Sequence, residues 1–280
     1  MASVAGLRAW RAMRWRDGKT VALVATMGNL HAGHAALIRR AREIADFVLV
    51  SVFVNPTQFG PGEDYSGYPR SLAADHALSG ESGADAVFAP SLAAVYPGGE
   101  GEITRVSVPG LTQILCGASR PGHFDGVTGV VTRLFHLAQP DFAIFGEKDY
   151  QQLVILRRMT ADLLFGIEIV AEATVRASDG LALSSRNQYL EPAERARAPA
   201  LYAALEKAAA ALHSGARASD VEAGGLHALE AAGFRPEYFS VRRADDLGVP
   251  QADSQLRVLA AAWLGKARLI DNIAVPPQRP

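Results

Sequence analysis

The stretch that decides the fold is Thr26-Met27-Gly28-Asn29-Leu30-His31-Ala32-Gly33-His34. An apolar run at residues 21–25 precedes it, and an amphipathic run at residues 35–46 follows it. This order predicts a strand, a tight turn that contains glycine, and the start of a helix. Because backbone N–H groups at a helix N-terminus are unpaired and attract negative charge, the turn is a candidate phosphate site. His31 and His34 add side-chain donors there. The alternative is an ordinary strand–helix turn with two incidental histidines.

Strand-like and helix-like segments alternate through the first two thirds of the chain. The predicted strands are residues 21–26, 47–54, 84–89 and 141–146. The spacing of apolar residues predicts helices over 35–46 and 127–138, and the second of these ends before Pro140. Repeated β–α units favour an α/β fold with a Rossmann-like, doubly wound parallel sheet, whose ligands bind at the carboxyl ends of the strands.

The sequence pattern changes after about residue 173. An alanine-rich run predicts one helix from Pro192 to Leu212, and a second helix is predicted over residues 219–232. Three strand-like pieces follow, at residues 238–242, 257–263 and 267–275. These elements predict a smaller α+β domain. We therefore place a Rossmann-like domain at residues 1–174 and the α+β domain at residues 175–280.

Composition narrows the class of protein. At 280 residues with 49% hydrophobic residues the chain has ample core, and the formal net charge of −1 gives no support to a nucleic-acid partner. The single cysteine, Cys116, cannot form an internal disulfide, which fits a reducing compartment. No apolar run approaches the roughly 20 residues that a membrane span needs. The arginine-rich N-terminus favours a surface helix, with a transit peptide as the alternative. We expect a cytoplasmic protein without membrane or nucleic-acid partners.

Four polar clusters follow apolar runs: His31 with His34, then residues 55–59, 146–152 and 184–187. If the sheet is parallel, the first three meet at one edge, and the fourth could reach that edge from the second domain. Lys148 and Arg186 offer charge and N–H donors to phosphate oxygens, which suits phosphoryl or nucleotidyl transfer. Gln58 and Gln152 are neutral donor–acceptor groups, which suit a hydroxylated organic acid. The alternative for each is a solvated charge cluster or an ordinary loop hydrogen bond.

Seven segments occur in the order seen in one enzyme family: residues 27–34, 53–59, 68–70, 123–127, 145–152, 184–187 and 269–274. Together they resemble the pantoate–β-alanine ligase (pantothenate synthetase) family over nearly the whole chain. The run Gly-Glu-Lys-Asp-Tyr-Gln-Gln at residues 146–152 is far more specific than the His-x-Gly-His turn, which many nucleotidyltransferases share.

The resemblance implies a two-step ligation. Pantoate carboxylate attacks the α-phosphorus of ATP and gives pantoyl adenylate and pyrophosphate; the amine of β-alanine then attacks the acyl carbon and releases pantothenate, a coenzyme A precursor, and AMP. It also implies ATP as co-substrate, Mg²⁺ accompanying ATP, a homodimer, and a C-terminal domain that acts as a lid.

The resemblance also implies site residues. The implied ATP site comprises Met27, Gly28, Asn29, Leu30, His31, Ala32, Gly33, His34, Gly146, Glu147, Lys148, Asp149, Val175, Leu183, Ser184, Ser185 and Arg186. The residues implied in catalysis are His31, His34, Lys148, Ser184, Ser185 and Arg186. Among these, His34 matches the proton-donor histidine of the family. Gln58 and Gln152 are implied to hold pantoate, and Gln58 also lies by the β-alanine position.

The chain departs from the family pattern at a few positions. They are Ala25, Asn29 and Ala32, where Pro, Ala and Glu are usual, and Leu183, where Met is frequent. Some members carry adjacent aspartates after the 68–70 region. Here Asp75 matches one of them and Ala74 takes the place of the other, so Asp75 is the candidate magnesium ligand. Phosphates and water are then the main ligands expected for magnesium.

Two other functions remain open from the residues. One is a different adenylating enzyme, such as an aminoacyl-tRNA synthetase with a similar His-x-Gly-His turn, although no large basic extension supports it. The other is a catalytically silent nucleotide-binding protein. The presence of Gln58 and Gln152 together with Lys148 argues against the second, because ATP binding alone needs no pocket for an organic acid.

Overall fold

The structure is a computed structural model that describes residues 1–101 and 103–277. The described residues form two compact units. The first comprises Met1–Gly146 and Ile155–Ala173, and the second comprises Glu147–Val154 and the described residues from Thr174 onward. The domain boundary predicted after residue 174 stays a prediction, and each unit is described below by itself.

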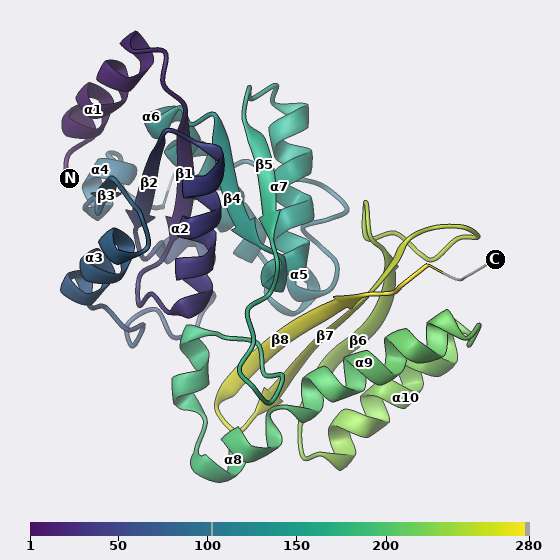
Figure 1. The fold of residues 1–280 in the computed structure, drawn as a ribbon. Coiled ribbons are helices and arrows are strands. Elements are labelled where there is room, and N and C mark those ends of the chain that lie inside the picture. Colours follow the sequence, from purple (N-terminus) through teal and green to yellow (C-terminus); the bar gives the residue numbers. More distant parts are fainter. Residues whose placement is uncertain (102, 278–280) are drawn as a thin grey trace. The chain divides into compact units, whose positions relative to one another are not determined.

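In the described part of the first unit, five strands form one sheet (Figure 1). They are β1 (Val21–Thr26), β2 (Phe47–Val52), β3 (Ala86–Phe88), β4 (Phe142–Gly146) and β5 (Glu168–Glu172). Their order is β3-β2-β1-β4-β5, and all neighbours are parallel. The predicted parallel sheet is therefore confirmed. The sequence pattern did not predict β5, a short edge strand with a glutamate at each end.

Helices cover both sides of this sheet (Figure 1). They are α1 (Val4–Arg16), α2 (Ala32–Ile44), α3 (Leu72–Glu81), α4 (Leu92–Val95), α5 (Cys116–Ser119), α6 (His123–Ala138) and α7 (Tyr150–Asp162), which belongs to this unit from Ile155 onward. The apolar face of α2 packs on β1, β2 and β4, where Ile38 and Ala41 are fully buried against strand residues such as Val24 and Val50. This packing fixes the start of α2 at the carboxyl end of β1, because helix and strand are joined by a short turn.

The second unit is the smaller α+β part that the sequence predicted. Its sheet contains β6 (Arg235–Arg243), β7 (Leu256–Leu264) and β8 (Ala267–Ala274), in that order and antiparallel. Its helices are α8 (Pro192–Arg197), α9 (Ala200–His213) and α10 (Ala218–Ala231). Leu201 and Leu205 of α9 share a buried core with Val258 and Ala260 of β7. In this sheet β8 is an edge strand.

One predicted helix is wrong in its extent. The alanine-rich run was expected to form a single helix from Pro192 to Leu212, but the structure ends α8 at Arg197 and begins α9 at Ala200. Pro199 lies between them. A proline lacks the N–H that an uninterrupted helix requires, and its ring clashes with the carbonyl four residues earlier. The hydrogen-bond pattern is therefore interrupted at this point, although Ala198 and Pro199 keep helical backbone angles. In the described residues, no helix has the length and apolar character that crossing a membrane requires.

Candidate functional site

The turn between β1 and α2 has a strained backbone that a buried carboxylate holds in place. Gly28 and Asn29 have φ angles of +86° and +51°, in the left-handed region. A Cβ at position 28 would lie 2.9 Å from Oδ2 of Asp75, so glycine is required there by both space and φ. Asp75 lies on α3 and is 2% exposed. Its Oδ2 accepts the N–H of Asn29 at 3.1 Å, and its Oδ1 accepts the N–H of Leu30 at 2.8 Å.

These contacts bear on the candidate magnesium ligand. Both oxygens of Asp75 accept backbone N–H groups, and such an arrangement positions a turn rather than a metal ion. Within the described residues, no group of three His, Cys, Asp or Glu side chains could hold a metal ion. In this structure Asp75 holds the turn after β1. A direct contact between Asp75 and magnesium stays a prediction.

The two histidines of the turn cap helix α2. Nδ1 of His31 accepts the N–H of Gly33 at 3.1 Å, and Nδ1 of His34 accepts the N–H of His31 at 3.2 Å. A neutral imidazole whose Nδ1 accepts a hydrogen bond carries its proton on Nε2. The two rings lie 4.2 Å apart between centroids. The N-terminus of α2 thus combines its own dipole with two adjacent Nε2–H donors, an arrangement suited to an anion.

A buried asparagine positions Gln58 beside this turn. Asn55 follows β2 and is 1% exposed. Its Nδ2 donates to Oε1 of Gln58 and to the carbonyl of Gly126, both at 3.1 Å. Its Oδ1 accepts from the hydroxyls of Thr57, at 3.0 Å, and Tyr96, at 2.7 Å. Because all of these bonds constrain one amide, Asn55 fixes which atom of the Gln58 side chain accepts and which donates.

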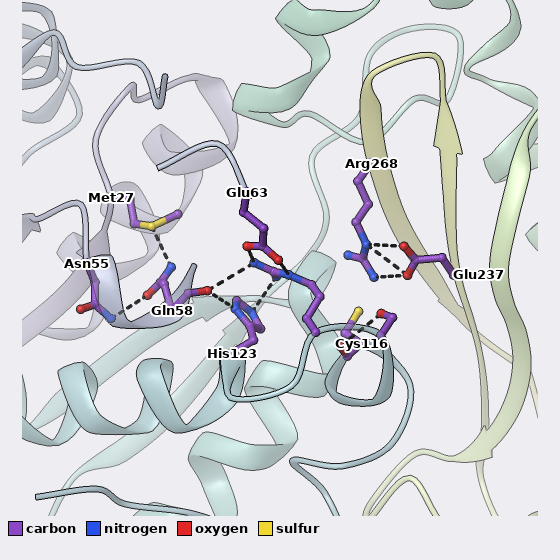
Figure 2. Close-up of polar contacts among 10 residues, drawn as sticks. Met27, Asn55, Gln58, Glu63, Cys116, His123, Glu237 and Arg268 are labelled. Atoms are coloured by element: carbon purple, nitrogen blue, oxygen red, sulfur yellow. Dashed lines mark hydrogen bonds and ion pairs between the residues drawn. The ribbon is translucent and has the colours of Figure 1, made fainter. Parts of the chain in front are cut away.

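Gln58 ends the short 3-10 helix η1 (Pro56–Gln58). Its Nε2 donates to Sδ of Met27 at 2.7 Å, which joins the segments after β1 and β2 (Figure 2). Helix α6 packs closely on η1, since a Cβ at Gly126 would lie 2.2 Å from the carbonyl oxygen of Thr57. The structure thus brings Gln58 of the 55–59 cluster into contact with Met27, which belongs to the same turn as His31 and His34.

A second network, which the sequence analysis did not include in the site, holds the backbone of Gln58. Nδ1 of His123 lies 2.7 Å from the Gln58 carbonyl oxygen, and its Nε2 lies 2.9 Å from a guanidinium nitrogen of Arg120 (Figure 2). Arg120 can only donate, so Nε2 accepts and the Nδ1–H of His123 donates to Gln58. From the sequence alone, His123 has a structural interpretation. Two signals marked it: its position just before a predicted helix, and its place in the segment 123–127 that carries the family resemblance.

Arg120 also forms a two-pronged ion pair with Glu63, at 2.7 Å and 2.5 Å (Figure 2). Burial raises the pKa of the Glu63 carboxyl, but the hydrogen bonds and charge of Arg120 outweigh that effect and hold this pKa below its usual value. Glu63 is therefore ionised at neutral pH and keeps Arg120 in place beside His123.

In the second unit, Lys148 lies on the 3-10 turn η2 (Glu147–Asp149). Nδ2 of Asn272 donates to the carbonyl oxygens of Glu147, at 2.9 Å, and Lys148, at 3.0 Å. The Glu147 carboxylate pairs with Arg257 at 2.8 Å. The ammonium of Lys148 lies 3.6 Å from the Asp149 carboxylate, and its side chain is 19% exposed. Lys148 is thus a half-buried positive charge on a turn that β7 and β8 hold.

The hairpin that precedes Arg186 is also held in this unit. The N–H of Leu183 donates to the carbonyl of Val175 at 2.9 Å, so the two predicted residues are paired. Oγ of Ser184 accepts the N–H of Arg186 at 3.3 Å and caps the 3-10 helix η3 (Ser185–Tyr189). Lys148, Ser184 and Asp271 line one small pocket. The structure therefore brings the 146–152 and 184–187 clusters together within this unit.

Other predicted residues lie where the sequence placed them locally. Gly146 ends β4, while Ala32 and Gly33 form the first turn of α2. Gln152 lies on α7 in the segment Glu147–Val154 of the second unit, whereas Gln58 lies in the first. A shared role of the two glutamines stays a prediction.

Comparisons with known proteins point to one family. The model of a family described as pantoate-beta-alanine ligase matches residues 1–274. The chain is 55% identical over 276 residues to a pantothenate synthetase of Azotobacter vinelandii, covering 98% of this chain and 97% of that protein. A relative of the same name from Thioalkalivibrio sulfidiphilus is 55% identical over 280 residues, covering 99% and 96%.

Solved structures that resemble this chain come from the same family. The crystal structure of pantothenate synthetase from Thermus thermophilus has a TM-score of 0.91 and 49% identity, with 99% of each chain covered. That of a pantoate-beta-alanine ligase from Francisella tularensis, complexed with beta-gamma ATP and beta-alanine, has a TM-score of 0.83 and 30% identity, covering 98% of this chain and 96% of that one.

Proposed function

The chain belongs to the pantoate–β-alanine ligase family, and from this premise we propose that it condenses pantoate with β-alanine in an ATP-dependent reaction through a pantoyl adenylate. The observation that carries the proposal is that one turn, between β1 and α2, leads into a helix N-terminus suited to an anion and also contacts an oriented neutral amide through Met27. The first is the His31–His34 cap of α2, and the second is Gln58, which Asn55 holds. A nucleotide-binding protein without a second substrate has no need of that amide.

In the first step, a carboxylate oxygen of pantoate attacks the α-phosphorus of ATP. The bond between the α-phosphorus and its bridging oxygen breaks, and pyrophosphate leaves with the electron pair. Such a transfer needs positioned donors more than a protein nucleophile. We assign the Nε2–H donors of His31 and His34 to the phosphate oxygens, with His34 as proton donor. We assign Lys148 and Arg186 to stabilise the negative charge that develops on the leaving pyrophosphate, with Ser184 and Ser185 as further hydrogen-bond donors.

In the second step, the amine of β-alanine attacks the acyl carbon of the adenylate. The carbon–nitrogen bond forms, the bond to the AMP oxygen breaks, and the amine loses a proton. Gln58 is assigned to pantoate and to the neighbouring β-alanine, and Gln152 to pantoate. An amide can donate to a hydroxyl or carboxylate oxygen and accept from a hydroxyl without adding charge beside the triphosphate.

Magnesium bound to ATP would neutralise part of the triphosphate charge. The proposal also includes a cytoplasmic homodimer whose C-terminal domain acts as a lid over the bound substrates.

Isotope exchange between pyrophosphate and ATP tests the proposal against the two other functions. We expect exchange that requires pantoate, proceeds without β-alanine and is not supported by amino acids. Exchange supported by an amino acid would favour an aminoacyl-adenylate enzyme. ATP binding without any exchange would favour a silent nucleotide-binding protein, and exchange that strictly requires β-alanine would exclude a free adenylate.

Variants of the glutamines locate the acid substrate. Gln58→Ala and Gln152→Ala should raise the KM for pantoate while ATP affinity stays near the wild-type value. Each leaves a substrate oxygen without a partner, a loss of roughly 1–3 kcal/mol. An effect confined to ATP affinity would show that these side chains bind the other substrate.

A further inference from the structure

Strand β8 carries two adjacent buried polar residues, Asp271 and Asn272, that the proposed reaction leaves without a role. Each is 3% exposed. They belong to the Leu-Ile-Asp-Asn-Ile-Ala run at residues 269–274, which the sequence analysis singled out only by resemblance. Successive residues of a strand point to opposite faces, and β8 is an edge strand with one side open to other segments. Two neighbouring side chains can therefore hold two different segments.

Asn272 holds the turn that carries Lys148. The two N–H groups of its amide donate to consecutive carbonyl oxygens, those of Glu147 and Lys148, at 2.9 Å and 3.0 Å. Its Oδ1 accepts from Nε of Arg257 at 2.6 Å, which fixes the orientation of the amide. Arg257 completes the arrangement, since it pairs with the Glu147 carboxylate and stacks on Tyr150 at 3.7 Å.

Asp271 holds the hairpin that leads to Ser184. Its carboxylate binds Arg176 through two bonds, of 2.5 Å and 2.9 Å. Arg176 also donates to the carbonyl of Gly180 at 3.1 Å, and its guanidinium carbon lies 3.7 Å from the centre of the Tyr202 ring. Because Arg176 pairs with Ala182 across the hairpin, its side chain anchors both arms. A buried two-pronged ion pair of this kind fixes direction as well as distance.

We propose that Asp271 and Asn272 are positioning residues that set the spacing between the two phosphate-binding segments of this unit. Asn272 fixes the Lys148 turn, Asp271 fixes the hairpin before Ser184, and the rigid backbone of β8 joins the two. The pocket lined by Lys148, Ser184 and Asp271 lies where these contacts meet. This inference rests on the proposed function and deepens it, since donors stabilise a transferring phosphoryl group only when held in place beforehand.

The first test replaces Asn272 by aspartate, which keeps the shape but turns a carboxylate toward the two carbonyl oxygens. We expect Asn272→Asp to lower kcat of pantoate-dependent exchange roughly tenfold or more, while the KM for pantoate changes less than about twofold. Asp271→Asn, which removes the charge facing Arg176, should raise the KM for ATP roughly tenfold. Hydrogen exchange should quicken at residues 147–152 in the first variant and at residues 176–187 in the second.

A matched control is Glu222→Gln, because the Glu222 carboxylate accepts hydrogen bonds from Ser240 and Val241 of the same sheet. It should lower stability without changing kcat or either KM. The proposal is overturned if folded Asn272→Asp and Asp271→Asn keep wild-type kinetics, as is expected of the control. It is also overturned if each variant impairs the use of pantoate and the use of ATP to the same extent.

Milder variants cover a failure to fold. Arg176→Lys keeps the positive charge but loses the two-pronged geometry, and Asn272→Ser keeps one short donor. A smaller rise in the KM for ATP in the first variant and a smaller fall in kcat in the second would support the proposal. Unchanged kinetics in both would overturn it. Absence of any pantoate-dependent exchange in the wild type would instead refute the proposed function. The spacing role would then be tested by ATP affinity and by the two hydrogen-exchange patterns. Weaker ATP binding with faster exchange at the expected residues would support it, and unchanged values would contradict it.

Discussion

Two of the segments that carry proposed phosphate-binding side chains, the turns after β1 and β4, are held in different ways. The turn after β1 is held largely by its own neighbourhood, since His31 and His34 cap the helix that they begin. The turn after β4 is held by Asn272, which lies 125 residues from Glu147 and 124 from Lys148 in the sequence. The first turn is a local motif with one distant anchor, Asp75, whereas the second depends on a strand of another segment.

This difference separates catalysis from positioning. In the first turn the capping atoms and the proposed catalytic atoms belong to the same imidazole rings, Nδ1 for the cap and Nε2 for the substrate. In the second turn they belong to different residues, so the Lys148 turn can be disturbed without altering the lysine itself. In the second unit, a substitution should therefore affect either catalysis or the position of the turn. In the first unit, a substitution of one histidine should affect both.

The largest expected effect comes from removing a proposed catalytic group from each turn. His34→Ala and Lys148→Ala should each lower turnover about a hundredfold or more, because one preorganised donor to developing charge contributes on the order of 3 kcal/mol. His34→Ala should also lower thermal stability, since it removes part of a helix cap, whereas Lys148→Ala should not. Steady-state kinetics beside thermal melts check both. Near-normal turnover in either variant would remove that residue from the catalytic set.

A smaller effect is expected from the anchor of the first turn. In Asp75→Asn, an NH₂ group replaces one acceptor and faces the N–H of Asn29 or Leu30, so we expect a loss of roughly 1–3 kcal/mol in stability and about a tenfold lower rate. The magnesium concentration for half-maximal rate should stay unchanged. If that concentration rises more than about tenfold at constant stability, Asp75 is a metal ligand rather than an anchor of the turn.

The ion pair behind Gln58 should appear in the pH dependence of stability. The pKa of Glu63 is lower in the folded protein than in the unfolded chain. The ion pair therefore stabilises the fold fully above the unfolded pKa of about 4.3, and this contribution is lost as pH falls through the folded value. Urea titrations between about pH 5 and 3 should show a shallower fall for Glu63→Gln than for the wild type. Equal slopes would show that Arg120 does not bind Glu63 in solution.

The smallest expected effect concerns the departure at Leu183. Leucine and methionine have similar volumes, and such exchanges cost less than about 1.5 kcal/mol, so Leu183→Met should leave turnover and ATP affinity nearly unchanged. Leu183→Asp should impair ATP use because it brings a negative charge into the proposed nucleotide site. ATP titrations at saturating pantoate compare the two. A large loss in Leu183→Met would mean that this position does more than offer apolar contact.

Much of the first unit was predictable because its signals are local. Apolar runs marked β1, β2 and β4, and the glycine-containing turn with its two histidines marked the start of α2. No comparable run marked β5, whose three apolar residues lie between two glutamates. The break at Pro199 lies inside an alanine-rich run. The sequence did carry a signal for this break, because a proline inside a helical run removes a backbone N–H that the helix needs, whereas a proline in the first turn, such as Pro192, does not.

The candidate site divides in the same way. Residue type and order, which are local properties, were enough to identify the side chains that bear the proposed chemistry: the histidines, the two glutamines, Lys148 and the Ser184–Arg186 segment. The tertiary structure was needed to show that Asn55 and His123 hold Gln58, that Asp75 binds the turn after β1, and that Asp271 and Asn272 hold two segments of the second unit. Those roles come from buried hydrogen bonds between residues far apart in the chain. Such bonds form only when packing has removed water and brought the partners within about 3 Å, and no local pattern records that pairing.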